Sequence, residues 1–360
     1  MHFAADRIQP AVGGLPVISL TRDQDGDVQP QLLNVEILPG RGMNVYQIRA
    51  FLPGLGVVGL LASPPLDEAA RFMNGGPDDA FGNQSFTVGG ALLIPYANRI
   101  GGQVSPDGRS VTVPMLGKPV RLPANWKDTA LHGLILDTPF DVIGTSAGED
   151  RATASAKYDA GSFGGHWLSE TALTVEAALT SRAFELTVTA KNTGAEPEPM
   201  SIGWHPYFVL PGGDRGQARL RIPARARTLV TNYEDMAATG ETVPVGGTPY
   251  DFSAPGGTPL GTMPLDECFL DLERNTWGEA VAEVIDPAAR YGMRVVAASP
   301  DIRVFQVYAP AGSCFAAIEP QFNLLDPFSA AWPAGVNTGM VMLKPGGRVA
   351  YNVRLELFVP

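Results

Sequence analysis

The sequence predicts an all-β fold, a large antiparallel β-sandwich with few and short helices. Apolar and polar residues alternate with a period of two wherever a pattern is legible, which is typical of half-buried strands. The 360 residues include 41 Gly and 32 Pro, and this frequency predicts many turns between short elements. Long helices that alternate with strands are not indicated, so a parallel α/β sheet is disfavoured.

The first half of the chain contains one helix signal and one hairpin signal. Residues 66–73 follow two prolines and predict a short helix. Asp107-Gly108 lies between the β-prone stretches 103–104 and 111–113. This dipeptide favours the tight turn of a β-hairpin.

The clearest strands lie in the second half of the chain. Residues 183–191 alternate strictly between apolar and polar side chains. Residues 172–180 have the same character and are joined to them by a short link, so the two predict a hairpin. A last strand is predicted at residues 349–358, after the turn residues 345–347.

One domain is expected over residues 1–360. Sandwich folds of this length occur as single units, although length alone is compatible with two domains. The Pro-rich and Gly-rich stretches at 194–199 and 244–259 look like loops between strands, and no internal repeat is visible. Whether the chain is a monomer or a homodimer is left open.

The charge of the chain argues against several classes of partner. Asp and Glu exceed Lys and Arg by 37 to 26, which gives a net charge of −11. Such a chain repels phosphate backbones and anionic lipids, so we expect neither nucleic-acid nor membrane binding. An apolar run long enough to span a membrane is missing. Residues 1–10 lack the apolar core of a secretory signal, so a cytoplasmic protein is expected.

The sequence contains no motif for a metal or an organic cofactor. Its two cysteines, Cys268 and Cys314, are too few for a disulfide scaffold or a cysteine zinc site, and both are expected to be buried thiols. The four histidines lack the spacing of a zinc helix, and phosphate loops and dinucleotide fingerprints are missing. We therefore expect no metal and no cofactor, which leaves acid–base chemistry by His and a carboxylate.

Two histidines and one glutamate are the main candidates for that chemistry. His132 and His205 lie among apolar or aromatic residues, where each is either a structural, hydrogen-bonded side chain or a general acid. Glu319 ends an apolar run, so it either turns outward or becomes buried, and burial would raise its pKa toward that of a general base. Asp266 is open to the same two interpretations. Arg99 interrupts an apolar stretch, either as a surface charge or as a donor to ligand oxygens.

These residues belong to short segments whose order along the chain resembles the aldose 1-epimerase (galactose mutarotase) family. The similarity extends from about residue 80 to the C-terminus, and before that only residues 40–48 look like the family's early strand. The segments are Tyr96-Ala97-Asn98-Arg99-Ile100, Leu131-His132-Gly133, Gly203-Trp204-His205-Pro206-Tyr207-Phe208, Leu265-Asp266, Gln306-Val307-Tyr308, Ile318-Glu319-Pro320-Gln321 and Leu343-Lys344-Pro345-Gly346-Gly347.

The resemblance implies a β-supersandwich with a sugar site in a cleft on one sheet. It implies an isomerase that interconverts the α and β anomers of a free monosaccharide without a cofactor. The general base maps onto Glu319 and the general acid onto His205. The remaining positions are expected to bind the sugar, and they are Asn98, Arg99, His132, Asp266 and Gln306.

Two departures from the family pattern affect specificity. Leu134 stands where a second Gly usually follows Leu-His-Gly, so the cleft wall is expected to differ there. Residues 210–265 match poorly, and loops in this stretch are expected to reshape specificity. Trp204, Tyr207 and Phe208 are candidates for an apolar platform under the sugar, although Phe208 also suits core packing.

Three alternatives stay open. A hexose 6-phosphate 1-epimerase would need a cationic pocket, for which Arg41, Arg71 and Arg99 lie in the relevant half of the chain. A non-catalytic carbohydrate-binding relative would keep the site and lose turnover. A polysaccharide lyase with the same sandwich would add a helical domain, and the sequence gives no sign of one.

Overall fold

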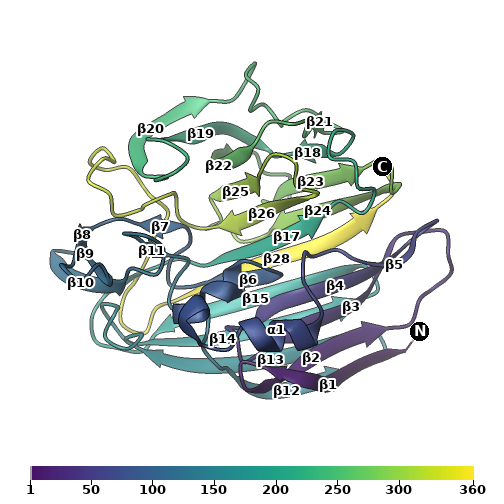
Figure 1. The fold of residues 1–360 in the computed structure, drawn as a ribbon, viewed down its shortest axis with the longest axis horizontal. Coiled ribbons are helices and arrows are strands. Elements are labelled where there is room, and N and C mark those ends of the chain that lie inside the picture. The colour runs from purple at the N-terminus through teal and green to yellow at the C-terminus, as the bar shows by residue number, and fades with distance from the viewer. Residues whose placement is uncertain (1) are drawn as a thin grey trace.

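The structure is a computed structural model that describes residues 2–360, and nearly all of its regular secondary structure is β-strand (Figure 1). Three large sheets of five, seven and nine strands make up most of it. Neighbouring strands in the two largest sheets pair antiparallel. The prediction of an all-β antiparallel fold is confirmed.

The N-terminal sheet and the seven-stranded sheet are joined at their edges. The N-terminal sheet contains, in order, β1 (Phe3–Val12), β2 (Leu15–Arg22), β3 (Gln31–Leu38), β4 (Asn44–Leu52) and β5 (Gly56–Gly59). The seven-stranded sheet contains, in order, β20 (Ala238–Pro244), β19 (Ala224–Val230), β22 (Leu265–Leu272), β25 (Val304–Ala309), β26 (Phe315–Gln321), β17 (Gly203–Val209) and β6 (Gly90–Leu93). Leu61 forms a bridge with Phe208, and the Val209 amide donates to the Leu60 carbonyl at 2.9 Å.

The nine-stranded sheet contains the strands that the alternation pattern predicts. Its order is β12 (Asp141–Ala147), β13 (Arg151–Gly161), β14 (Thr171–Thr180), β15 (Ala183–Asn192), β28 (Arg348–Phe358), β24 (Tyr291–Ala297), β23 (Ala280–Asp286), β18 (Arg219–Arg221) and β21 (Thr258–Pro259). Strands β14, β15 and β28 agree with the predicted segments to within one residue. The C-terminal strand β28 lies in the middle of this sheet, between β15 and β24.

Short elements complete the chain. The small strands are β7 (Arg99–Ile100), β8 (Gln103–Val104), β9 (Ser110–Met115), β10 (Lys118–Pro123), β11 (Ala130–Leu131), β16 (Glu198–Met200) and β27 (Val341–Leu343). Strands β8 and β9 form the predicted hairpin, and helix α1 (Leu66–Phe72) is the predicted helix. The 3₁₀ segment Pro77–Phe86 was not predicted. A kink with positive φ at Phe81 and Gly82 interrupts it, so it has no helical period to detect.

The two largest sheets pack face to face through alternate residues. Phe184 of β15 and Trp204 of β17 are both buried, and their rings lie 6.3 Å apart between centroids. Trp204 is therefore a core residue, and its predicted place under a sugar is wrong. Phe208 is also fully buried, as the alternative prediction of core packing had it. Because neighbouring residues of a strand face opposite sides, His205 points away from this core.

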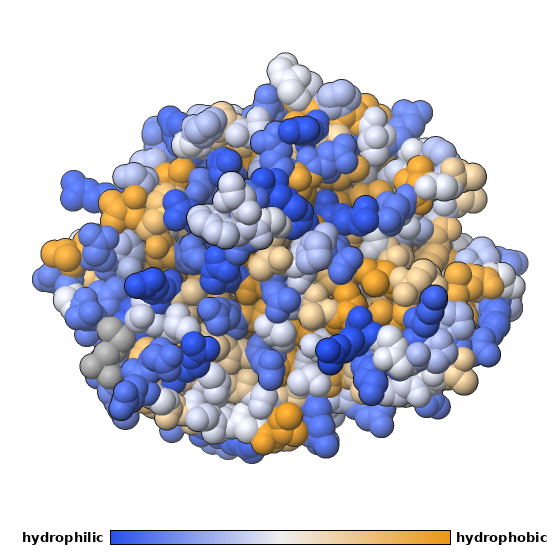
Figure 2. Space-filling model, turned by 180° about the vertical axis from the view of Figure 1, so that it is seen from behind, coloured by the Kyte–Doolittle hydropathy of each residue, from blue (hydrophilic) through white to orange (hydrophobic). Residues whose placement is uncertain are grey.

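The surface is largely hydrophilic, as expected when the polar residues of alternating strands face outward. Seen from behind, hydrophilic side chains cover much of the molecule, with hydrophobic ones in smaller groups between them (Figure 2). Cys268 is buried as predicted, whereas Cys314 is exposed, because it lies in the turn that precedes β26 rather than within a strand.

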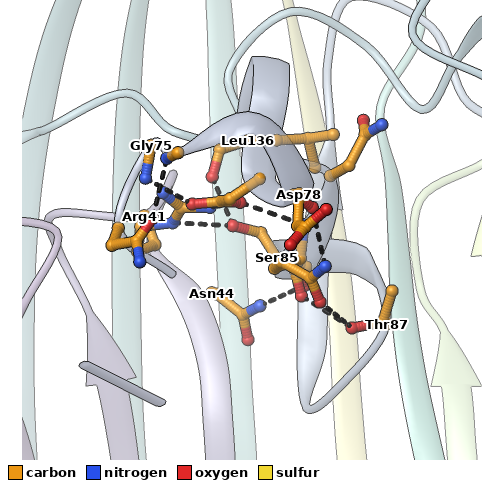
Figure 3. A network of polar contacts seen from close by, with 12 residues as sticks. Arg41, Asn44, Gly75, Asp78, Ser85, Thr87 and Leu136 are labelled. Atoms are coloured by element: carbon orange, nitrogen blue, oxygen red, sulfur yellow. Dashed lines mark hydrogen bonds and ion pairs between the residues drawn. The ribbon is translucent and has the colours of Figure 1, made fainter. Parts of the chain in front are cut away.

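A buried polar network holds the 3₁₀ segment against the first sheet (Figure 3). Arg41 and Asp79 are both buried, and Arg41 Nη2 lies 2.6 Å from Asp79 Oδ1. Arg41 Nε donates to Ser85 Oγ at 2.9 Å, and Ser85 Oγ donates to the Leu136 carbonyl at 2.6 Å. Asn44 Nδ2 donates to the Ser85 carbonyl at 2.6 Å. Segments that are far apart in the sequence are thus fixed to one another.

Replacing Arg41 with Met is expected to lower the free energy of unfolding by about 3–5 kcal/mol, because the Asp79 carboxylate then stays buried without its counter-ion. Urea denaturation measures this loss. Arg71→Met is the control, since Arg71 forms an exposed pair with Asp67, and its loss is expected to stay below about 0.5 kcal/mol. Similar losses in the two variants would contradict the prediction.

A second buried carboxyl lies in β16. Glu198 is fully buried, and the Thr171 hydroxyl donates to it, with Oγ1 3.0 Å from each carboxyl oxygen. Burial disfavours the charged form and raises the pKa of Glu198 to about 7, although the Thr171 hydrogen bond opposes this shift.

The raised pKa of Glu198 makes stability depend on pH. The folded state holds a proton that the unfolded chain releases above its ordinary pKa of 4.5. The stabilisation is therefore complete below pH 4.5 and is lost as the pH rises toward 7. From pH 5 to pH 8 we expect this group to remove roughly 2–3 kcal/mol of unfolding free energy. Urea denaturation of Glu198→Gln should lack this contribution, and an unchanged pH dependence would contradict it.

Candidate active site

Four neighbouring strands, β22, β25, β26 and β17, form the floor of the site. Gln306 of β25 pairs with Glu319 of β26, and the register of β17 against β26 places His205 opposite Glu319. Residues directly opposite one another point to the same face of a sheet. The three side chains therefore share the face that points away from the core between the two largest sheets.

Two turns next to the small sheet of β7 and β11 contribute Asn98 and His132 to the cavity. Leu131 pairs with Arg99, and the His132 amide donates to the Asn98 carbonyl at 3.0 Å. Asn98 and His132 both adopt the left-handed conformation, with φ of 60° and 62°. This conformation is uncommon outside Gly, and it turns both side chains out of the line of their strands.

A chain of hydrogen bonds connects the turns to the floor. Asn98 Nδ2 donates to Gln306 Oε1 at 3.1 Å, and Gln306 Nε2 donates to Asp266 Oδ1 at 2.7 Å. Asn98 Oδ1 in turn accepts from the Arg99 amide at 3.1 Å. These contacts fix the orientation of two side-chain amides and one carboxyl group.

All seven predicted site residues line one cavity of about 280 Å³. Tyr207, the third candidate for the apolar platform, also lines it. The rest of the wall was not predicted to line the site, and half of it comes from loops with no pattern of their own. These further residues are Phe86, Thr87, Trp126, Leu131, Met236 and Tyr308.

His205 and Glu319 form a close pair on the cavity floor. His205 Nε2 lies 3.3 Å from Glu319 Oε1, and the two side chains are 5% and 2% exposed. Burial raises the pKa of Glu319 well above its ordinary value, and the negative charge of Asp266 adds to this effect. Burial also lowers the pKa of His205 to about 4. Both shifts favour the uncharged forms, so the pair holds one proton near neutral pH.

His132 packs against the pair. Its ring meets the His205 ring edge-on, with centroids 4.9 Å apart, and the Phe86 ring lies 5.1 Å away on another side. Burial, followed by positive charge at His205 and Arg99, holds the pKa of His132 well below its ordinary value. This shift favours the neutral imidazole, which has one N–H donor.

Asp266 is the other carboxyl of the cavity. Burial raises its pKa to about 6, while the positive charge of Arg99 and the hydrogen bond from Gln306 act in the opposite direction. Above that pH it is an anion that accepts hydrogen bonds and cannot donate one.

The described part of the chain lacks both a metal-binding cluster and a membrane-spanning helix. Residues 2–360 contain no group of three or more His, Cys, Asp and Glu side chains arranged to hold a metal ion. No helix within the same range has the length and apolar character needed to cross a bilayer.

The sequence profile described as aldose 1-epimerase matches residues 65–356, which is most of the chain. The chain belongs to the aldose 1-epimerase family. No curated protein matches the sequence.

Solved structures extend the family likeness to the whole fold. A galactose mutarotase-like protein from Clostridium acetobutylicum is 18% identical and has a TM-score of 0.79, over 100% of this chain and 99% of its own. An aldose epimerase homologue from C. elegans is 16% identical with a TM-score of 0.72, over 99% and 100%. Galactose 1-epimerase from Lactobacillus acidophilus is 16% identical with a TM-score of 0.68, over 99% and 98%. These structures therefore share the fold of the whole chain, which includes the N-terminal sheet.

Leu134, which departs from the aldose 1-epimerase pattern, does not lie where the sequence predicted. Leu134 is not among the residues that line the cavity. Its side chain packs against the main hydrophobic core, and its amide donates to the Ile94 carbonyl at 2.7 Å. The expected change in the cleft wall at this position is therefore wrong.

Proposed function

We propose that the protein is an aldose 1-epimerase, an isomerase that interconverts the α and β anomers of a free aldose. The observation that carries the proposal is the His205–Glu319 pair, 3.3 Å apart on the floor of a cavity sized for a single sugar. Anomer exchange requires one group to take a proton from the C1 hydroxyl and another to give a proton to the ring oxygen. A carboxyl and an imidazole that share one proton can do both.

In the reacting form that we propose, the proton shared by the pair lies on His205, so the Glu319 carboxylate acts as the base and the His205 imidazolium as the acid. Glu319 takes the proton of the C1 hydroxyl while His205 Nε2 gives its proton to the ring oxygen. The bond from C1 to the ring oxygen breaks and C1 becomes an aldehyde carbon. Rotation about the C1–C2 bond presents the other face of the aldehyde. Ring closure then returns the proton from the ring oxygen to His205 and that of Glu319 to the C1 oxygen.

The other cavity residues would hold the sugar during these steps. His132 and Arg99 are placed to donate hydrogen bonds to oxygens on which negative charge grows as the ring opens. Asp266, Gln306 and Asn98 would bind hydroxyl groups, because their own hydrogen bonds already fix their orientation.

A neutral aldose suits the cavity better than a hexose 6-phosphate. Arg41 and Arg71, which the sequence offered for a phosphate, pair with Asp79 and Asp67 instead. Arg99 does line the cavity. Asp266 lies close enough to act on its charge, so a phosphate dianion would meet one cation beside an anion.

Polarimetry of freshly dissolved sugars tests the proposal. We expect the protein to accelerate the mutarotation of α-glucose or α-galactose in proportion to its concentration. Glucose 6-phosphate serves as a competitor, and strong competition would favour the phosphate alternative. Binding of aldoses without any acceleration would favour a non-catalytic carbohydrate-binding protein.

A further inference from the structure

One loop reaches from the edge of the seven-stranded sheet to the cavity. Residues 231–237 connect β19 to β20, and we name them the cleft strap. Met236 of the strap is buried and lines the cavity. The strap lies within residues 210–265, the stretch that matches the family pattern poorly.

The strap is hydrogen-bonded to two segments of the cavity wall. Arg99, on one wall, donates from Nη1 to the Asp235 carbonyl at 3.0 Å. Lys127 follows the wall residue Trp126, and its Nζ donates to the Glu234 carbonyl at 3.2 Å. The Lys127 ammonium also lies 3.7 Å from Glu234 Oε1. The strap thus bridges segments that are more than one hundred residues away in the sequence.

A third contact anchors the strap to the floor strand β22. The Tyr233 hydroxyl donates to Glu267, whose carboxyl is also held by Arg227 Nη1 at 2.7 Å. Glu267 directly follows Asp266, and neighbouring residues of a strand face opposite sides. The strap therefore holds the edge of the sheet through Tyr233 while Met236 reaches the cavity.

We propose that the cleft strap limits the substrate to a free monosaccharide and excludes reducing disaccharides. The inference rests on the proposed function, which puts C1 and the ring oxygen at Glu319 and His205. In a pyranose the atoms opposite C1 and the ring oxygen are C4 and C3. A sugar attached at C4 would therefore extend away from the floor, toward the segments that the strap joins. The cavity of about 280 Å³ is at the small end of ligand pockets, so a second ring would have to extend beyond it, past Met236 of the strap.

The two ends of the strap lie close enough for a short turn to replace it. The Thr231 amide donates to the Ala237 carbonyl at 2.9 Å, so the two ends already lie side by side. Val230 and Ala238 pair directly before them. Replacing residues 232–236 with Asn-Gly would close the β19–β20 hairpin with a two-residue type I′ turn.

The experiment compares two sugars with the same reacting end, α-glucose and α-lactose, which is glucose carrying a galactose at C4. For the wild-type protein we expect kcat/KM for α-glucose to exceed that for α-lactose by at least about 20-fold. In the strap replacement this ratio should fall at least about fivefold, mainly through a rise for α-lactose.

Two point variants give a matched comparison that does not depend on the loop replacement folding. Lys127→Met removes the exposed tie to Glu234, and the ratio should fall by about twofold to threefold. Lys118→Met removes a similarly exposed pair with Glu196, outside the cavity lining, and the ratio should not change.

Equal acceleration of the two sugars by the wild-type protein would overturn the proposal. So would an unchanged ratio in both the strap replacement and Lys127→Met. Calorimetric measurement of glucose and lactose binding tests the strap proposal independently of catalytic activity. If no aldose is accelerated but glucose alone binds, the proposed function fails and the strap proposal stands. If both sugars bind equally well, the strap proposal fails.

Discussion

Replacing Glu319 with Gln is expected to lower the rate of mutarotation by about 10²- to 10⁴-fold, the usual contribution of a positioned acid–base group. Glutamine has nearly the same shape and fills the same buried site, but its amide can neither take the proton of the C1 hydroxyl nor return it. Polarimetry of α-glucose at saturating concentration measures the effect on kcat.

The fold of this variant is expected to survive, because burial already favours the uncharged form of Glu319. Glu198→Gln is the matched control. Glu198 is also a buried carboxyl with a raised pKa, and it does not line the cavity. Its replacement should leave mutarotation unchanged at pH 7. Near-wild-type rates in Glu319→Gln would show that another group is the base.

Three strands of the nine-stranded sheet, β14, β15 and β28, were predicted because their own sequences alternate between apolar and polar residues. In β15 the apolar residues face the core and the polar ones face outward, so the period of two is visible within ten residues. The 3₁₀ segment Pro77–Phe86 has no comparable alternation or helical period in its sequence. Its place depends on Arg41 and Ser85, which are 44 residues apart in the sequence.

The residues themselves indicated His132, His205, Glu319, Asp266 and Arg99 as separate candidates, but only the family resemblance placed them in one site. Nothing local to Glu319 says that Gln306 and His205 lie beside it, because that follows from strand register. The resemblance named seven residues that line one cavity, while the roles assigned to them, and the single domain, stay predictions. Trp126 and Met236 were not predicted because they lie in loops without a sequence pattern. The Arg99–Asp235 contact was not predicted because the two residues are 136 positions apart in the sequence.

Replacing His205 with Asn is expected to lower kcat by at least about 10²-fold, since Asn cannot give a proton to the ring oxygen. His166→Asn is the control, because His166 lies outside the cavity lining and its Nδ1 lies 2.7 Å from the Arg121 carbonyl oxygen. Its mutarotation rate should equal that of the wild-type protein. Equal losses in the two variants would contradict a specific role for His205.

The pH profile gives this prediction a second, independent readout. The pKa of His205 is lowered to about 4, while that of Glu319 is raised, so over a wide range the pair holds one proton. Below about pH 4 the pair gains a second proton and Glu319 can no longer act as the base, so kcat should fall there. In His205→Asn the site has no imidazole to take that proton, and the residual rate should fall at higher pH, where the Glu319 carboxyl itself becomes protonated. An acid limb that stays at the same pH in the two proteins would assign it to a group other than His205.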